Sequence, residues 1–110
     1  MNVKDLISTG HFKLVSKSER CDRDIKGIYS CDLLSWVMSH ANNDDAWITV
    51  QAHANIVAVA SLLELSCIIV VENASVDEET IEKANEHQVP VLTTSKSAYE
   101  VITFLNDMGL

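Results

Sequence analysis

The segment Ala46–Asn73, AWITVQAHANIVAVASLLELSCIIVVEN, carries the pattern that decides the fold. It opens with a short β-branched and aromatic run, continues with a longer apolar run of helical character, and closes with a second apolar run at Cys67–Val71. A strand, a helix and a second strand in this order are typical of a parallel βαβ unit, because parallel strands need a crossover connection. The apolar stretch is interrupted by two serines and a glutamate and is shorter than the roughly 20 residues that span a bilayer. We therefore place it inside a folded domain, with no membrane partner.

The same alternation of strand-like and helix-like runs extends to both sides of this unit. We predict a single domain over residues 1–110 of the α/β class, a three-layer sandwich with a mainly parallel sheet flanked by helices. The expected strands are Phe12–Val15, Lys26–Ser30, Ala46–Val50, Cys67–Val71 and Val89–Thr93. The expected helices are Val3–Thr9, Asp32–Ala41, Ala52–Leu65, Asp77–Gln88 and Ser97–Met108. Ser75 and Ser97 each stand three residues before a glutamate, which is the spacing of a capping box at the start of a helix.

Composition and charge exclude several classes of protein. The three cysteines are odd in number and have no CxxC spacing, which favours reduced thiols in the cytosol, and the amino terminus lacks the pattern of a secretory signal. The net charge is −8, yet six of the eight Lys and Arg side chains lie in the first 26 residues. Nucleic-acid binding needs clustered cations, so we expect no nucleic-acid partner for most of this surface. The basic end remains suited to one small anion.

The helix expected at Ala52–Leu65 is apolar on all sides. Its two faces are formed by Ala54, Val57, Ala58 and Leu62 on one side, and by Ile56, Val59, Ala60 and Leu63 on the other. A single sheet can cover only one of these faces, so we predict a homodimer built on this helix, with Trp36 and Met38 contributing. The alternative is a helix enclosed on both sides within one chain.

Polar residues follow each of the expected parallel strands. In open parallel sheets, ligands bind beyond the carboxyl ends of the strands, where helix amino termini offer free amide groups. The helix beginning near Ser97 would suit a carboxylate or a phosphate. Each of these residues has a simpler alternative role, such as the capping of a helix by Asp32 or Ser97. The predicted ligand-binding residues are Ser30, Asp32, Gln51, His53, Asn55, Asn73, Thr94, Ser95 and Lys96.

Other chemistries find weaker support in the sequence. A small hydrolase using Asp32 and His53 with Ser30 or Cys31 can be drawn, but no GxSxG elbow is present. The four histidines are scattered singly and two of the cysteines, at positions 21 and 31, are too far apart for paired metal ligands, so we predict no metal. Neither a GxxxxGK[ST] loop nor a GxGxxG motif is found, and we predict no cofactor.

A family resemblance covers nearly the whole chain. The matching stretches are Asp22-Arg23, Lys26-Gly27, Ser30–Ser35, Trp47–Gln51, His53–Ala60 and Val89–Thr94. Together they resemble the DRTGG domain family. Asp22, Arg23 and Gly27 match the motif in the family name, whereas Lys26 stands where threonine is usual and Ile28 where the second glycine is usual.

The resemblance implies an α/β domain of this size, usually attached to pairs of CBS domains or to enzymes of acyl-phosphate metabolism. It is also distantly similar to the amino-terminal domain of HPr kinase/phosphorylase. Its alternation of strands and helices looks like that of the uridine-nucleotide domain of Mur ligases. The resemblance implies no catalytic residues. We therefore expect a non-enzymatic, homodimeric sensory or regulatory module that binds a small anionic metabolite or nucleotide. The alternatives are a protein-interaction subunit without a small ligand and, less favoured, a small hydrolase. For the motif itself we expect a turn in which Asp22 and Arg23 pair and Gly27 permits a close backbone approach.

Overall fold

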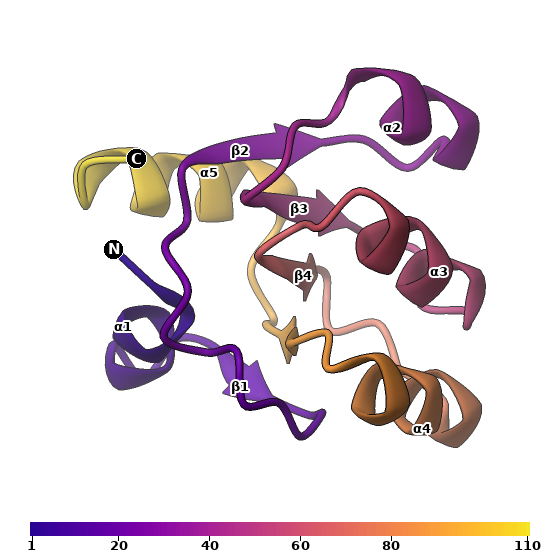
Figure 1. Cartoon of the computed structure of the whole chain (residues 1–110). Helices are drawn as coiled ribbons and strands as arrows, with labels where there is room; N and C mark the ends of the chain where they lie inside the picture. The colour runs from indigo at the N-terminus through magenta and orange to yellow at the C-terminus, as the bar shows by residue number, and fades with distance from the viewer.

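A five-stranded sheet with helices on both faces forms the centre of the computed structural model, which describes residues 1–110 (Figure 1). The strands lie in the order β1-β5-β4-β3-β2. Their bounds are β1 Lys13–Leu14, β2 Gly27–Ser30, β3 Asp45–Thr49, β4 Cys67–Val70 and β5 Val91–Thr93. The helices are α1 Val3–Ser8, α2 Leu34–His40, α3 Asn55–Leu62, α4 Glu78–His87 and α5 Ala98–Asp107. The predicted α/β class and the order of elements are confirmed; β3 has the predicted length but starts one residue earlier, and the other elements are shorter than predicted.

The sheet is mixed because β1 runs opposite to its neighbour. Strands β2 to β5 are parallel to one another, whereas β1 pairs antiparallel with β5, with Lys13 opposite Thr93. An antiparallel partner for the fourth parallel strand brings the amino-terminal segment to the carboxyl end of β5. This pairing matters for the site described below.

Two hydrophobic clusters, one on each face of the sheet, hold the three layers together. One cluster joins residues of α1 and α5 to the sheet, and the other joins α2, α3 and α4 to the opposite face. Because helices cover both faces, every residue of β3 and β4 is buried, including Trp47, whose indole Nε1–H donates to the carbonyl of Cys31 at 2.8 Å. Such strands read as continuous apolar runs rather than as alternating ones.

Helix starts follow the predicted capping only in part. Ser97 and Glu100 form the expected capping box at α5. The capping box expected from Ser75 is wrong, because α4 is capped by Asp77, whose carboxylate accepts from the amide and the hydroxyl of Thr80. Asp32 does not cap α2 either, since the N-cap position is Leu33 and no side chain bonds there.

The capping carboxylates predict a loss of stability in acid. Hydrogen bonds lower the pKa of Asp77, first of all from the Thr80 hydroxyl, and the amide of Ser97 lowers the pKa of Glu100. A carboxylate with a lowered pKa stabilises the fold above its ordinary pKa and loses that contribution as the pH falls through the folded-state value, below about pH 4. We expect the combined variant Asp77→Asn and Glu100→Gln to be less stable than the natural chain at pH 7 and to lose less stability on acidification. Urea unfolding midpoints at pH 7 and pH 3 measure both effects, and an equal acid loss in the two chains would contradict the assignment.

The middle helix buries more of its surface than its sequence suggested. Both predicted apolar sides contain buried residues, since Val57 is 1% exposed and Ile56 is 0% exposed, and α3 lies between α2 and α4 on the same face of the sheet (Figure 1). Ala58 and Leu62 remain exposed. The outward apolar surface of α3 is therefore a narrow stripe, continued by exposed side chains at Leu33 and Trp36 of the neighbouring α2 region.

The three cysteines are unpaired thiols. Cys21 and Cys67 lie in the core, and burial raises the pKa of Cys67 to about 12, so this thiol stays protonated and serves as a packing group.

None of the helices has the length and apolar character needed to cross a bilayer.

Candidate functional site

The predicted ligand residues lie along the carboxyl-terminal rim of the parallel strands, but they fall into two groups of different character. The first group follows β2 and β3. There, the Asp32 carboxylate accepts from the Thr49 hydroxyl at 2.8 Å and from the Val50 amide at 2.9 Å, and the Gln51 side chain donates to the Asp32 carbonyl at 3.2 Å. These polar groups tie the loop after β2 to the loop after β3. Their hydrogen-bonding capacity is largely used within the chain.

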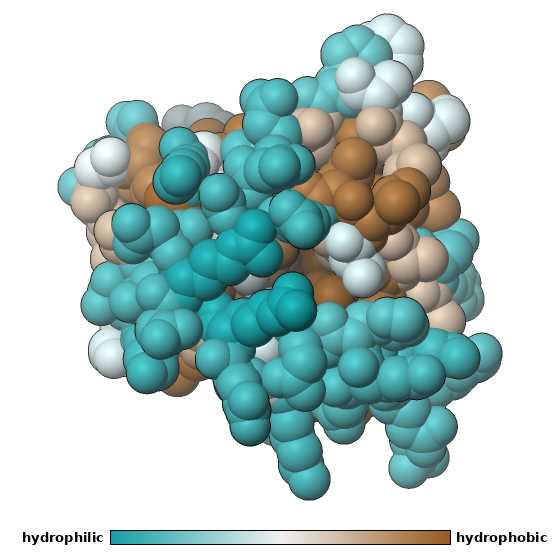
Figure 2. Space-filling model, viewed as in Figure 1, coloured by the Kyte–Doolittle hydropathy of each residue, from teal (hydrophilic) through white to brown (hydrophobic).

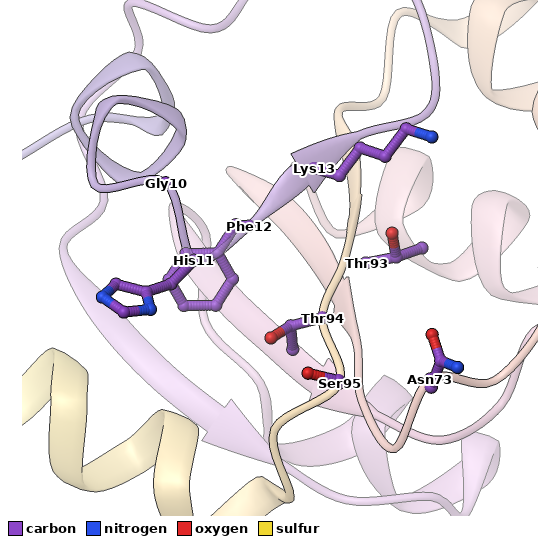
Figure 3. Close-up of a pocket in the computed structure, with 8 residues that line it drawn as sticks. All are labelled: Gly10, His11, Phe12, Lys13, Asn73, Thr93, Thr94 and Ser95. Atoms are coloured by element: carbon purple, nitrogen blue, oxygen red, sulfur yellow. The ribbon is translucent and has the colours of Figure 1, made fainter.

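The second group lines an open pocket at the ends of β4 and β5, which we call the edge pocket (Figure 3). Its volume is about 300 Å³. The walls come from three segments: the start of β1, the turn after β4 and the end of β5. The lining residues are Gly10, His11, Phe12, Lys13, Asn73, Thr93, Thr94 and Ser95.

Backbone hydrogen bonds hold the turn after β4 against the loop after β5. The amide of Glu72 donates to the Lys96 carbonyl and the amide of Asn73 donates to the Thr94 carbonyl, both at 2.9 Å. Glu72 and Asn73 both have positive φ, at 62° and 55°, a region that residues other than glycine adopt at some cost. The two bonds keep this unfavourable turn in place and so position Asn73 on the pocket wall.

The structure brings together three of the nine predicted ligand residues, Asn73, Thr94 and Ser95. Lys96 is not on the pocket wall, because its ammonium lies 5.7 Å from the centre of the Phe104 ring on α5. The amides at the start of α5 are used only in part, since those of Ala98 and Tyr99 have no acceptor within the chain. The Ser97 amide donates to the Glu100 carboxylate and the Glu100 amide donates to the Ser97 hydroxyl, which is the capping box described above.

The remaining predicted residues lie elsewhere on the rim. Ser30 is exposed at the end of β2, and Asn55 is exposed at the first residue of α3. The His53 side chain is 81% exposed, and its Nδ1 atom is 3.9 Å from the Asp77 carboxylate rather than near Asp32. The Cys31 thiol faces the Leu33 carbonyl. The nucleophile and base that a hydrolase would need are therefore not assembled here, and no group of three or more His, Cys, Asp or Glu side chains is placed to hold a metal ion.

Sequence reasoning missed His11, Lys13 and Thr93. In Figure 3 the Lys13 and Thr93 side chains lie on one side of the strands, whereas the His11 ring points away toward α5, where it contacts Phe104 edge-on at 4.8 Å. The antiparallel pairing of β1 with β5 places these residues, and no local pattern reveals that pairing. The one available signal was the concentration of cations in the first 26 residues, which suggested a small anion without saying where.

The residues of the name motif lie at the opposite edge of the sheet. Arg23 Nε contacts the Asp44 carboxylate at 2.6 Å and Arg23 Nη2 donates to the Glu64 carbonyl at 2.9 Å, so the expected pairing of Asp22 with Arg23 is wrong. We call this contact set the Arg23 clamp. It joins the turns before β3 and β4, where Asp44 and Glu64 both have positive φ.

Gly27 opens β2 beside the clamp and meets the expectation of a close approach. A Cβ atom at this position would lie 2.6 Å from Oδ1 of the buried Asp45. The other oxygen of that carboxylate accepts from the Asn42 amide at 2.8 Å, so the side chain is held where it is. The motif residues Arg23 and Gly27 thus support the packing of the strand starts, away from the edge pocket.

A mixed five-stranded sheet between two helix layers places this chain among the small α/β domains. The chain belongs to the DRTGG domain family, whose model matches residues 5–108. The resemblance predicted from the sequence is confirmed.

Among solved structures, the chain is similar to the CBS and DRTGG domains of the regulatory region of Clostridium perfringens pyrophosphatase, crystallised with its activator, diadenosine tetraphosphate. The TM-score is 0.77 at 17% sequence identity, and the match covers 93% of this chain but 44% of that one. At this identity the similarity shows a shared fold, and the chain spans less than half of that regulatory region. None of the curated proteins matches the chain.

Proposed function

We propose that this domain is a non-catalytic regulatory module that binds a small anionic metabolite or nucleotide at the edge pocket and works as a homodimer. Membership of the DRTGG family supports a regulatory role. The similar pyrophosphatase region is itself regulatory and was crystallised with a nucleotide activator, which supports a phosphate-bearing or otherwise anionic ligand.

The observation that carries the ligand proposal is the charge of the pocket. The chain carries a net charge of −8, yet no Asp or Glu lines the edge pocket, and Lys13 is there without an ion-pair partner. A local cation in an acidic protein favours small anions and disfavours cationic ligands. This agrees with the anion expected for the basic end of the chain.

A thermal-shift experiment tests the ligand proposal. A ligand that binds only the folded chain stabilises it by about 2.7 kcal/mol at 100 times its dissociation constant. We expect at least one of inorganic phosphate, acetyl phosphate and adenine nucleotides to raise the melting temperature at constant ionic strength. Potassium chloride is the control for general salt effects. The absence of any shift with the whole set would contradict the proposal.

The homodimer proposal rests on a charge-free apolar surface. Helices α2 and α3 contain no Asp, Glu, Lys or Arg. Leu33, Trp36, Ala58 and Leu62 are exposed on or next to these helices, and we call them the apolar face. Figure 2 shows hydrophobic surface over α2 and α3 and hydrophilic surface over α4. Two copies of a chain with charge −8 repel each other. The repulsion is weakest where neither copy presents a carboxylate, so the apolar face is the surface on which two copies can approach.

The apolar face also supports a second candidate function, the recruitment of a different protein. Exposed apolar patches mark protein interaction sites in general, and Trp36, at 52% exposure, is a side chain typical of such sites. A chain that stays monomeric at high concentration would favour this alternative over the homodimer. The three unpaired thiols support the prediction of a cytosolic location.

A further inference from the structure

Strand β2 is an edge of the sheet, and one side of its backbone has no partner. It pairs only with β3 and is the uppermost strand in Figure 1. The Cys31 amide donates to the Ile48 carbonyl of β3. Because backbone groups point to alternate sides along a strand, those of Tyr29 also face β3. The N–H and C=O groups of Ile28 and Ser30 therefore point away from the sheet, and no loop or side chain of the chain bonds to them.

The features that usually protect a sheet edge are missing from β2. Edge strands commonly carry a charge, a proline or a bulge, which prevents pairing with another chain. The segment from Gly27 to Cys31 contains no charged residue and no proline, and its register with β3 is unbroken. The opposite edge, β1, is only two residues long and carries the exposed Lys13. Of the two edges, β2 is therefore the one suited to receive a further strand.

The residues along β2 are complementary to those of a second copy. A twofold axis pairs two identical strands in antiparallel orientation. With the axis at Tyr29, Ile28 of each copy lies opposite Ser30 of the other, so all the outward backbone groups of these residues find partners. The same register sets Lys26, which is exposed, opposite the exposed Asp32 of the second copy. Opposite charges then meet at both ends of the paired strands.

Neighbouring registers lack this complementarity. A shift of two residues in one direction sets Asp32 opposite Asp24 of the second copy, which places like charges together. A shift in the other direction sets Asp32 opposite Ile28, without a cation. The register centred on Tyr29 also brings the two tyrosines into a pair without hydrogen bonds, where cross-strand side chains are closest. The sequence around β2 thus favours one register.

The apolar face adjoins this edge. Tyr29 packs against the hydrophobic cluster beneath α2, α3 and α4, so it lies on the α2 side of the sheet. Helix α2 directly follows β2, and Leu33 and Trp36 are 61% and 52% exposed there. A twofold axis between antiparallel strands is perpendicular to the sheet, so the α2 helices of both copies lie on the same side of it. The free backbone edge and part of the apolar face then form one continuous surface.

Resting on the proposed homodimer, we propose that two copies join edge to edge through antiparallel pairing of their β2 strands about a twofold axis at Tyr29. The pairing makes one sheet that runs through both copies. A strand from a different protein could use the same backbone groups, but the matching of Lys26 with Asp32 selects a second copy of this chain.

Amide hydrogen exchange measured by NMR tests the pairing without any substitution. Spectra are recorded at protein concentrations below and above the dissociation constant of the dimer. We expect the amides of Ile28 and Ser30 to exchange about tenfold or more slowly in the dimer, because they gain hydrogen bonds there. The Tyr29 and Cys31 amides are the internal control, since they face β3 in both states and should be protected at both concentrations.

A proline at the edge tests the same contact by substitution. Ser30→Pro removes an N–H group that the single chain does not use, and its ring occupies the open edge. We expect the dissociation constant of the dimer to rise about tenfold or more, since the bond is lost on both copies. Ser30→Ala is the matched control: it keeps the N–H group and should dimerise like the natural chain. Sedimentation velocity measures association, and circular dichroism shows that each variant is folded.

The outcomes separate this inference from the homodimer itself. A dimer whose Ile28 and Ser30 amides exchange as fast as those of the monomer would overturn the edge pairing and leave the dimer to the apolar face alone. An unchanged dissociation constant in folded Ser30→Pro would have the same meaning. A natural chain that stays monomeric at every concentration would overturn both proposals.

Discussion

A chain carrying Leu62→Asp is expected to sediment as a monomer at concentrations where the natural chain is a dimer. Leu62, the last residue of α3, is 68% exposed and belongs to the charge-free apolar face. In a twofold dimer the substitution places a carboxylate in the same contact on both copies, where it loses its hydration without gaining a partner. We expect the dissociation constant to rise by roughly two orders of magnitude, as for residues that dominate an interface. Sedimentation velocity over a range of concentrations measures it.

The control for this experiment is Tyr99→Asp. Tyr99 is 77% exposed on α5, in the other helix layer, so the same added charge should leave the dimer intact. A loss of dimer in both variants would mean that net charge, rather than the apolar face, governs association. A natural chain that remains monomeric at every concentration would refute the homodimer and direct attention to a different protein partner for the apolar face.

Removal of the Arg23 side chain is expected to cause the largest loss of stability among the exposed or half-buried positions. Arg23→Ala removes the 2.6 Å contact to Asp44 and the hydrogen bond to the Glu64 carbonyl together. The Asp44 side chain is 19% exposed, so its carboxylate is left with poor compensation from water. We expect a loss of about 2–3 kcal/mol, which corresponds to a drop in melting temperature of roughly 10 °C.

Lys26→Ala provides the comparison. Lys26 also reaches Asp44, but at 3.6 Å and from a side chain that is 71% exposed, so its removal should cost under about 1 kcal/mol. Urea unfolding at one fixed protein concentration measures both variants, because the stability of a dimer depends on concentration. Similar losses for the two variants would mean that a general effect of charge, and not the Arg23 clamp, holds the turns together.

Much of the fold could be predicted because most elements carry a signal in their own few residues, such as an apolar run or a capping residue. The buried strands β3 and β4 are continuous apolar runs, and Ser97 with Glu100 marks the start of α5 within four residues. Where two local signals competed, the prediction went wrong. Ser75 and Asp77 both precede α4 and both can cap a helix, and the chain uses Asp77, which directly adjoins the first turn.

The site was harder to predict because its contacts join distant parts of the chain. The rim itself follows from the parallel sheet, so Asn73, Thr94 and Ser95 could be named in advance. Lys13 could not be placed, because nothing near it in sequence shows that β1 lies beside β5. The partner of Arg23 was missed for the same reason: Asp44 is 21 positions away, whereas Asp22 is its neighbour in sequence.

The antiparallel edge of the sheet has a kinetic consequence. The Ser16 hydroxyl, just beyond β1, accepts from the Val91 amide across a separation of 75 residues, so this edge closes only when the two ends of the chain meet. Contacts between such distant positions tend to form late in folding. A ligand bound at this edge would stabilise an arrangement that the folding transition state has not yet reached. Such a ligand would lower the unfolding rate and leave the folding rate unchanged.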